Sequence, residues 1–561
     1  MEIPGRFNPM PTLTIDGKEI EVPAGTTVIQ AAEKLGIFVP RYCYHPGLSI
    51  AGNCRICLVE IEKAPKLQIA CNTPVAEGMV VRTNTQKVAE GQQSVLEFLL
   101  INHPLDCPVC DQSGECDLQN FYMQYGRYDA RFEEQKVKKP KAVPLGPTIM
   151  LDAERCILCS RCVRFTDEIS KTGEFGIFNR GDRAVVGLYP GKVLDNNYSG
   201  NVADICPVGA LTDRDFRFKA RVWYLSSAPS VCNGCSQGCN IDVHSVTDRP
   251  YLADGARVMR LKPRPNPEVN QWWMCDVGRY GYKFIDQGRL TKVTHKGREI
   301  SWEEALTEMA AGLSGAKKEG KQGQVAVIAS AQLSTEELYL IKKLFGESLG
   351  MAVTANVPEK PGTDDGFLLK ADRNPNTAGA VLLGLVPGTE RYQVPMLTAA
   401  DLVEKGISGQ LSALWVFGQD LVKLFGEEKV KRLSEKLCQF IFVGSNENGT
   451  SRYAHWVLPS AVYIEKDGTF INWQGRVQRI GKAFEPLQGS RSEWEILLDL
   501  ARRLNVPIAA KSPQEIFAQL AKEIPAFAGM TYEKIGLQGV QIPGHPRESE
   551  DRSPIKSGMT K

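Results

Sequence analysis

The segment ERCILCSRCVRF, residues 154–165, decides how the middle of this chain must fold. It contains Cys156, Cys159 and Cys162 with two residues between neighbours, and a distant Cys206 is followed by proline. Three thiolates at this spacing with a remote Cys-Pro are the ligand pattern of a [4Fe–4S] cluster, and zinc rarely uses such a triple. Because no second complete triple lies nearby, we expect Cys206 to close the same cluster.

The other cysteines extend this pattern along the chain, which contains 16 of them. Apart from Cys438, they form three more compact groups, one of which includes a histidine. Numbered in chain order, the first group is Cys43, Cys54, Cys57 and Cys71; the second is His103, Cys107, Cys110 and Cys116; the third is Cys156, Cys159, Cys162 and Cys206; and the fourth is Cys232, Cys235, Cys239 and Cys275. Soft sulfur ligands in four successive sets favour a protein that conducts electrons.

Spacing alone leaves zinc open for some of these groups. Three thiolates and one imidazole are also a common structural zinc set, so the second group is ambiguous by itself. We favour cluster ligation by His103 because it precedes a proline and lies close to three cysteines. A neutral imidazole in place of a thiolate would raise the reduction potential of that cluster. Cys438 lies in an apolar run and is expected to be a buried structural thiol.

Length and composition limit the class of protein. A chain of 561 residues exceeds one hydrophobic core, and 43% hydrophobic with 24% charged residues is typical of globular proteins. The net charge of +2 is too small to indicate binding to nucleic acid or to an anionic membrane surface. Without an apolar run of membrane-spanning length or a signal peptide, the sequence predicts a soluble cytoplasmic protein or a peripheral part of a larger assembly.

The first part of the chain predicts a small ferredoxin-like α+β domain around the first group. Alternating strands flank Asp16 and Gly17, which is a strong hairpin signal. A helix is expected to begin after Thr27 and to end before Gly36. Further strand-like sequence follows at residues 57–62 and 79–83.

The pattern changes twice further along the chain. Residues 92–101 read as an amphipathic helix that delivers the second group, and the proline- and lysine-rich residues 136–147 are interpreted as a linker. Apolar runs typical of buried strands occur after residue 300, at residues 324–330, 378–386, 411–418 and 438–444. Helical stretches such as residues 334–350 alternate with them, so we expect a parallel α/β sheet.

Four segments resemble the family of the large cluster-bearing G subunit of bacterial respiratory NADH–quinone oxidoreductase, or complex I. They are RYCYHPGLSIAGNCRICLVEIE at 41–62, NHPLDCPVCDQSGECDLQN at 102–120, ERCILCSRCVRF at 154–165 and DICPVGAL at 204–211. The resemblance covers about residues 10–535. It implies a [2Fe–2S] cluster on the first group and one [4Fe–4S] cluster on each of the other three, with no molybdenum, tungsten, FMN or NAD bound by this chain.

The same resemblance implies a multidomain α+β and α/β architecture. The expected domains are a β-grasp [2Fe–2S] ferredoxin-type domain at 10–91, a [4Fe–4S] domain with His(Cys)3 ligation at 92–131, a [4Fe–4S] ferredoxin-like domain at 147–225, a [4Fe–4S] domain of the Mo/W bis-MGD type at 228–285 and a molybdopterin-oxidoreductase-like α/β domain at 300–535. The end of the chain is polar and poor in apolar residues, so its composition, and not the resemblance, predicts a disordered tail at 536–561.

The family also implies a direction of electron flow. Electrons pass from the NADH- and flavin-binding subunit to the first group, then to the third, then to the second, and leave through a smaller ferredoxin-like subunit toward quinone. The fourth group resembles an extra site off this route. The chain would be peripheral on the cytoplasmic side of the bacterial inner membrane, as part of a proton-translocating complex, and would itself carry no catalytic site.

Other functions fit parts of the pattern. The α subunit of a molybdenum- or tungsten-dependent formate dehydrogenase carries similar cluster modules, but it needs a cysteine or selenocysteine ligand further downstream, where only Cys438 is present. An iron-only hydrogenase would need a further cysteine cluster, and a structural zinc scaffold is the alternative of another class. Arg55, Arg161 and Arg164 lie among the ligands, where they could stabilise reduced clusters or, equally, serve surface solvation or subunit salt bridges.

Overall fold

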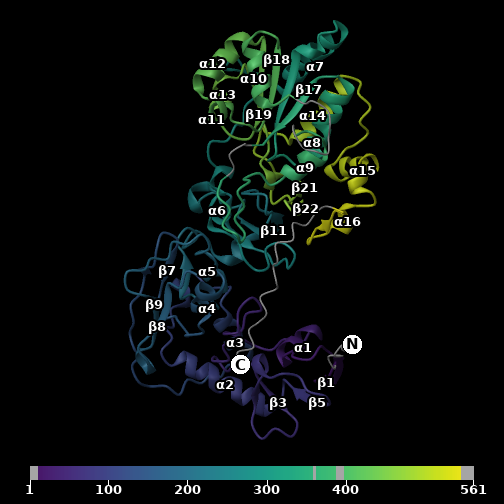
Figure 1. Cartoon of the computed structure of the whole chain (residues 1–561). Coiled ribbons are helices and arrows are strands. Elements are labelled where there is room, and N and C mark those ends of the chain that lie inside the picture. Colours follow the sequence, from purple (N-terminus) through teal and green to yellow (C-terminus); the bar gives the residue numbers. More distant parts are fainter. Residues whose placement is uncertain (1–9, 358–361, 387–396, 545–561) are drawn as a thin grey trace. The chain divides into compact units, whose positions relative to one another are not determined.

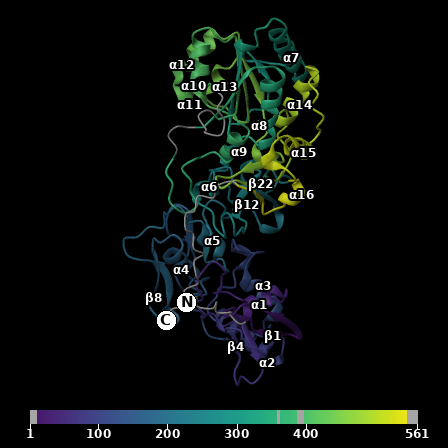
Figure 2. The same cartoon turned by 45° about the vertical axis from the view of Figure 1, so that its right-hand side comes forward.

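The computed structural model describes residues 10–357, 362–386 and 397–544. The chain divides after Leu225 into two compact units (Figures 1 and 2). Within the described ranges, no helix is both long and apolar enough to cross a bilayer.

A five-stranded mixed sheet with one helix opens the first unit. Its elements are β1 (Thr12–Ile15), β2 (Lys18–Glu21), α1 (Val28–Lys34), β3 (Leu58–Ile61), β4 (Gln68–Ile69) and β5 (Met79–Arg82). Asp16 and Gly17 both have positive φ in the β1–β2 turn, which is the geometry that Asp-Gly hairpins favour. The strand order is β2-β1-β5-β3-β4, with β1 parallel to β5, and α1 buries its apolar side chains against the sheet. This arrangement confirms the predicted ferredoxin-like fold.

The rest of the first unit consists of short helices and small sheets that carry ligand loops. They are α2 (Gln86–Leu100), α3 (Asp117–Tyr125), β6 (Val143–Pro144), β7 (Ile149–Leu151), α4 (Arg161–Glu168), β8 (Phe175–Phe178), β9 (Val185–Leu188), α5 (Asn201–Ile205) and β10 (Leu211–Asp213). α2 begins earlier than expected because the Thr85 hydroxyl caps it by accepting from the Val88 N–H at 3.3 Å. The interpretation of residues 136–147 as a linker was wrong for Val143 and Pro144, because these residues form β6 and pair with β7.

The second unit combines a three-stranded antiparallel sheet with a seven-stranded mixed sheet. The first contains β11 (Ser226–Val231), β12 (Asn240–Ser245) and β13 (Val258–Pro263), followed by α6 (Asp276–Tyr280). The strands of the seven-stranded sheet are β14 (Thr294–His295), β15 (Arg298–Glu299), β16 (Val325–Ser330), β17 (Ala352–Asn356), β18 (Ala413–Phe417), β19 (Gln439–Gly444) and β20 (Trp456–Pro459). Their order across the sheet is β15-β14-β20-β19-β18-β16-β17. The five strands from β17 to β20 are parallel, as expected for an α/β domain.

Helices cover both faces of the seven-stranded sheet (Figure 1). Alternate residues of one strand enter different cores, so Val327 of β16 packs with one set of helices and Ile328 with the other. The first set includes α7 (Trp302–Lys318), α8 (Thr335–Ile341), α14 (Glu493–Arg503) and α15 (Pro513–Glu523), and the second includes α10 (Ala399–Ile407) and α12 (Glu427–Lys436). Burial on both faces explains why these strands read as continuous apolar runs.

Two sequence expectations in this domain were wrong. The run at 378–386 is not a strand, because its first half belongs to the buried helix α9 (Thr377–Leu382). A short apolar run has no periodicity that separates a buried helix from a buried strand. Cys438 is exposed rather than buried, because it precedes the first residue of β19 instead of lying within the strand.

The C-terminal boundary also differs from the expected one. Within the predicted tail of residues 536–561, β23 (Val540–Gln541) pairs with β22 (Arg476–Ile480), which itself pairs with β21 (Gly468–Ile471). The start of this segment is therefore part of a sheet. Residues 545–561 lie outside the described part of the chain.

A buried ion triad lies in the second unit. The Lys466 ammonium contacts Glu337 Oε1 at 2.7 Å and also pairs with Glu493. Glu337 accepts from the Ser334 N–H at 2.9 Å and so caps the start of α8, while Glu493 begins α14. The triad thus ties two helices of the same core to the segment before β21.

Candidate iron–sulfur cluster sites

The first group is assembled by loops of the β-grasp sheet. Cys43 lies between α1 and β3, Cys54 and Cys57 directly precede β3, and Cys71 follows β4. Cys54 Sγ accepts from the Cys43 N–H at 3.4 Å. The Cys71 thiol is in hydrogen-bonding contact with both Cys43 and Cys57, so all four sulfurs meet in one place.

The second group surrounds a small cavity at the ends of two helices. His103 follows α2, Cys116 is the N-cap of α3, and Cys107 and Cys110 lie between them; all four line the cavity. Burial lowers the pKa of His103 to about 4, because charging the imidazole away from water is unfavourable. The imidazole is therefore held in the neutral form that can donate a lone pair to a metal.

The third group lines a second cavity of the first unit. Cys156 and Cys159 lie in the loop before α4, Cys162 in its first turn, and Cys206 directly after α5. Leu158 and Ser160 have positive φ, which lets the loop wrap around its own sulfurs, and the Leu158 N–H donates to Cys156 Sγ at 3.4 Å.

The fourth group lines a comparable cavity in the second unit. Cys232 follows β11, Cys239 precedes β12, and Cys275 is the N-cap of α6. The Gly234 N–H donates to Cys232 Sγ and the Gly278 N–H to Cys275 Sγ, each at 3.4 Å.

The chemistry and space of these sites fit iron–sulfur clusters. Backbone N–H groups already point at sulfur in three groups, as they do where they tune cluster potential. A side chain at Gly278 would bring its Cβ within 2.8 Å of Cys232 Sγ, so glycine keeps the approach to the sulfur open.

The electrostatics fit the same conclusion. Burial raises the pKa of Cys156 to about 11 and that of Cys206 to about 12, and neighbouring thiols add to the effect. Burial also raises the pKa of Cys275 to about 12. Thiolates in such surroundings need a bound cation to carry their charge, and iron supplies it in a cluster.

Arginines tie the third group to the first. Arg164 Nη2 donates to the Cys43 carbonyl at 2.6 Å and to the Cys159 carbonyl at 3.4 Å. Arg161, which is buried, donates to the Tyr44 carbonyl at 2.7 Å and to the Ile205 carbonyl at 2.9 Å. Surface solvation is therefore the wrong interpretation for Arg161. Arg55 is exposed.

A further arginine, not singled out in the sequence, ties the third group to the second. Arg155 directly precedes Cys156 and is buried, and its guanidinium makes a two-pronged contact with Asp106 at 2.8 and 3.2 Å. Asp106 in turn directly precedes Cys107. In the sequence, the only sign that Arg155 has a role is its position next to a ligand. The sequence does not show that its partner is Asp106.

One apolar core joins the three groups of the first unit. Buried side chains of this core include ligands from each of them, namely Cys43, Cys116 and Cys159. Val208 and Ala210, from the loop after Cys206, pack in the same core. The third group therefore has direct structural links to both of the others.

Gly209, in the loop after Cys206, is expected to be essential for the second group. A Cβ atom at this position would overlap the Cys110 sulfur, and Gly209 also lines the cavity of the second group. We expect Gly209→Ala to displace Cys110 and to remove one [4Fe–4S] cluster, measured as a loss of about four irons per chain. In the control, Gly187→Ala, the new Cβ meets Phe178 at an ordinary 3.5 Å, and full iron content is expected. An unchanged iron content in Gly209→Ala would contradict this account.

Family models match five parts of the chain between residues 9 and 503. They are a 2Fe-2S iron-sulfur cluster binding domain at 9–86, an NADH-ubiquinone oxidoreductase-G iron-sulfur binding region at 92–131, the ferredoxin-like domain of NADH-quinone oxidoreductase subunit 3 at 146–212, a molybdopterin oxidoreductase Fe4S4 domain at 225–287 and molybdopterin oxidoreductase at 292–363 and 359–503.

Known proteins resemble the chain over nearly its full length. The G subunit of NADH-quinone oxidoreductase from Rickettsia felis is 32% identical and covers 92% of this chain and 91% of its own. The mitochondrial 78 kDa subunit of NADH-ubiquinone oxidoreductase from Neurospora crassa is 44% identical over 92% of this chain and 84% of its own. Among solved structures, an NAD+-reducing [NiFe]-hydrogenase chain is 29% identical over 38% of this chain and 91% of its own, with a TM-score of 0.34.

Proposed function

The chain belongs to the family of the NADH-quinone oxidoreductase G subunit, and we propose that its four ligand groups hold one [2Fe–2S] and three [4Fe–4S] clusters. Its function is to relay electrons as part of that oxidoreductase complex. When bound, the clusters supply the acceptance and release of single electrons. The protein residues hold them, fix their spacing and set their potentials by ligand type, degree of burial and N–H contacts.

The observation that carries this proposal is the shared core of the first three groups. Arg164 links Cys43 to Cys159, and the Arg155–Asp106 pair links the third group to the second. These contacts support an order in which electrons pass from the first group through the third to the second. The arginines also place positive charge beside the ligand loops, which would stabilise reduced clusters.

The fourth group is proposed to be filled but off the main route. It belongs to the second compact unit, whereas the other three share one core in the first. We further propose that a flavin- and NADH-binding subunit delivers electrons, that a ferredoxin-like subunit removes them, and that the complex lies peripherally on the cytoplasmic side of the bacterial inner membrane.

The position of Cys438 argues against the formate dehydrogenase alternative. This cysteine lies just before the N-terminal end of β19 and is exposed. Open parallel sheets bind their ligands beyond the carboxyl ends of the strands, so Cys438 is at the wrong edge to ligate a pterin-bound metal.

Metal analysis of the anaerobically purified chain tests the proposal. Full loading predicts about 14 iron atoms per chain with matching sulfide and without stoichiometric molybdenum or tungsten. About ten irons would mean that one [4Fe–4S] site is empty. Zinc without sulfide would contradict the relay function, and stoichiometric molybdenum or tungsten would favour a formate-dehydrogenase-type enzyme.

A further inference from the structure

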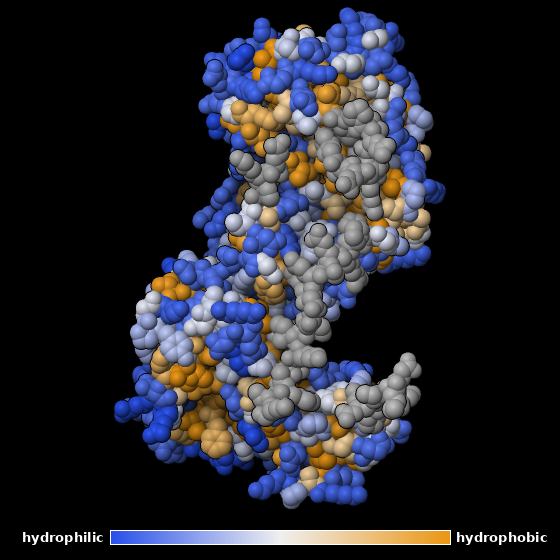
Figure 3. All heavy atoms as spheres, viewed as in Figure 1, coloured by the Kyte–Doolittle hydropathy of each residue, from blue (hydrophilic) through white to orange (hydrophobic). Residues whose placement is uncertain are grey.

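The hydroxyl of Tyr42 is buried and has no hydrogen-bond partner in the described part of the chain. Polar side chains form much of the surface that Figure 3 shows, where water can pair with them, but Tyr42 is 0% exposed. A buried hydroxyl without a partner is unfavourable, and native proteins rarely keep one without a reason.

The space that holds the Tyr42 ring is apolar. It belongs to the core that the first three groups share. The ring packs against Phe121 of α3, with ring centroids 5.1 Å apart, and Leu96 and Leu118 lie in the same core. A phenylalanine would fill this space without an unpaired oxygen. The hydroxyl therefore indicates an acceptor that belongs to the bound clusters.

Tyr42 spans two of the ligand groups. Its backbone directly precedes Cys43 of the first group, and the Cys43 N–H donates to Cys54 Sγ at 3.4 Å, which fixes the start of the Tyr42 side chain. Its ring reaches α3, and the N-cap of this helix is Cys116 of the second group. The residue thus carries a polar group from the loop of one cluster toward a ligand of another.

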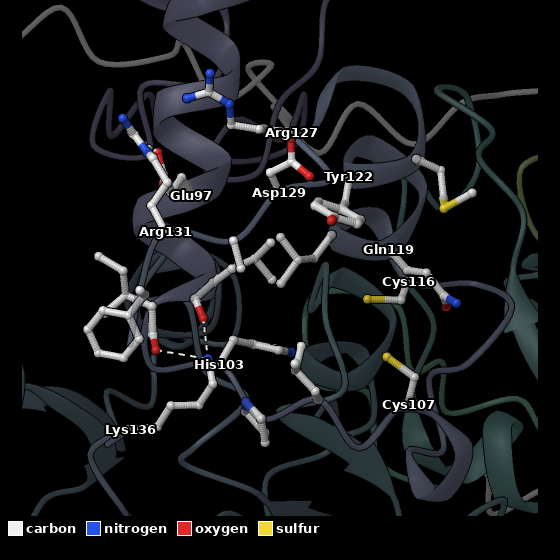
Figure 4. Close-up of a pocket in the computed structure, with 18 of the residues that line it drawn as sticks. Glu97, His103, Cys107, Cys116, Gln119, Tyr122, Arg127, Asp129, Arg131 and Lys136 are labelled. Carbon is white, nitrogen blue, oxygen red and sulfur yellow. Dashed lines mark hydrogen bonds and ion pairs between the residues drawn. The ribbon is translucent and has the colours of Figure 1, made fainter. Parts of the chain in front are cut away.

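Cys116 is the ligand that acts most strongly on the hydroxyl. Burial raises the pKa of Tyr42, and among the charged neighbours Cys116 adds most to this effect. Asp117 and Cys54 act in the same direction but less strongly. Figure 4 shows Cys116 next to Cys107, and Cys107 is exposed whereas Cys116 is buried. On the buried side of the second group, a protein donor takes the place that water has at the surface.

We propose that the Tyr42 hydroxyl donates a hydrogen bond to the Cys116 sulfur when the second group holds its cluster, and so raises the reduction potential of that cluster. A free thiol is a weak acceptor, whereas a cysteine bound to iron has lost its proton and accepts more strongly. Reduction adds negative charge to the cluster, so a donor stabilises the reduced form more than the oxidised form. This proposal rests on the proposed function, because it requires a filled second group.

The variant Tyr42→Phe removes only the hydroxyl and leaves the ring in its apolar space. The potential of the second group's cluster is measured by redox titration of the full, cluster-loaded chain with EPR detection, and its signal is identified as the one that is lost in Cys110→Ala. At a fixed potential, we expect Tyr42→Phe to lower the ratio of reduced to oxidised cluster about tenfold, a fall in potential of about 59 mV. The iron content should not change.

Tyr44→Phe is the matched control, because Tyr44 lies on the other side of Cys43 and is 4% exposed. Its ring packs in the core of the β-grasp sheet, and its hydroxyl is in hydrogen-bonding contact with Gln30 of α1. The control should keep the potential of the second cluster. ENDOR spectra in H2O and D2O give a direct readout: one exchangeable proton coupled to the reduced second cluster should be lost in Tyr42→Phe and retained in Tyr44→Phe.

The outcomes separate this proposal from the function on which it rests. An unchanged potential in an iron-loaded Tyr42→Phe chain, or a shift confined to the first group's cluster, would overturn the hydrogen bond to Cys116 and leave the relay intact. A wild-type chain without iron and sulfide would overturn both. If Tyr42→Phe loses iron, 3-fluorotyrosine at position 42 takes its place, because its hydroxyl is a stronger donor of nearly the same shape. It should raise the potential of the second cluster, and an equal or lower potential would overturn the proposal.

Discussion

Replacement of Cys162 by alanine is expected to abolish electron transfer from NADH to quinone. Cys162 is buried in the first turn of α4 and lines the cavity of the third group. The variant leaves three thiols around a space that was shaped for four, so the [4Fe–4S] cluster should be lost. Because the third group is linked to both the first and the second, its loss should interrupt the relay.

The measurement is NADH-driven quinone reduction by the assembled complex, together with EPR of each cluster. Assembly is checked by native electrophoresis, so that a missing complex is not taken for a broken relay. Cys438→Ala is the matched control, because this cysteine is exposed and outside the four groups. Turnover that survives in an assembled complex without the EPR signal of the third group would disprove the proposed order.

The fourth group gives the contrasting result. Cys235→Ala should remove its cluster and weaken the stability or assembly of the second unit, while electron transfer in assembled complexes continues. The reason is that Cys235 belongs to the second unit and not to the core shared by the first three groups. A clean loss of electron transfer in a fully assembled complex would place the fourth group on the route.

Replacement of Lys466 by methionine is expected to destabilise the second unit by about 3–5 kcal/mol. The side chains of Lys466, Glu337 and Glu493 are each 5% exposed or less. Without the ammonium, two carboxylates would face each other in the core. Burial and the charge of Glu337 raise the pKa of Glu493 to about 7 even though Lys466 lies beside it, so the carboxylate would be less stable still without the ammonium.

Thermal unfolding of the full chain by calorimetry measures this effect. Lys429→Met is the control, because Lys429 pairs with Glu404 at the surface, where the two side chains are 43% and 58% exposed. The control should change the free energy of unfolding by about 0.5 kcal/mol or less. Equal melting temperatures of the two variants would show that the triad does not stabilise the second unit.

The local pattern of the sequence was enough to predict the ferredoxin-like fold and the parallel α/β domain. Asp16 and Gly17 favour one turn geometry, and strands buried on both faces, such as β16, β18 and β19, are apolar over most of their length. The ligand groups were also predictable as sets, since two-residue gaps bring sulfurs together within a single loop. In the structure each predicted set surrounds one site.

The local sequence pattern gave wrong predictions where contacts with residues far away in the chain determine the conformation. The apolar run at 378–386 became a helix because the surrounding core, and not its own periodicity, determines its conformation. Cys438 is exposed because the strand begins one residue later. Residues 540–541 join a sheet because β22 offers them an open edge, which their own composition does not indicate.

The sequence by itself determined which residues can hold clusters, because ligand chemistry depends on residue type and short spacing. Only the tertiary structure decided how the groups are connected. The contact of Arg164 with Cys43, the pairing of Arg155 with Asp106 and the approach of Gly209 to Cys110 all join segments far apart in the chain. Such contacts form when separate loops pack into one core, and no local pattern specifies them.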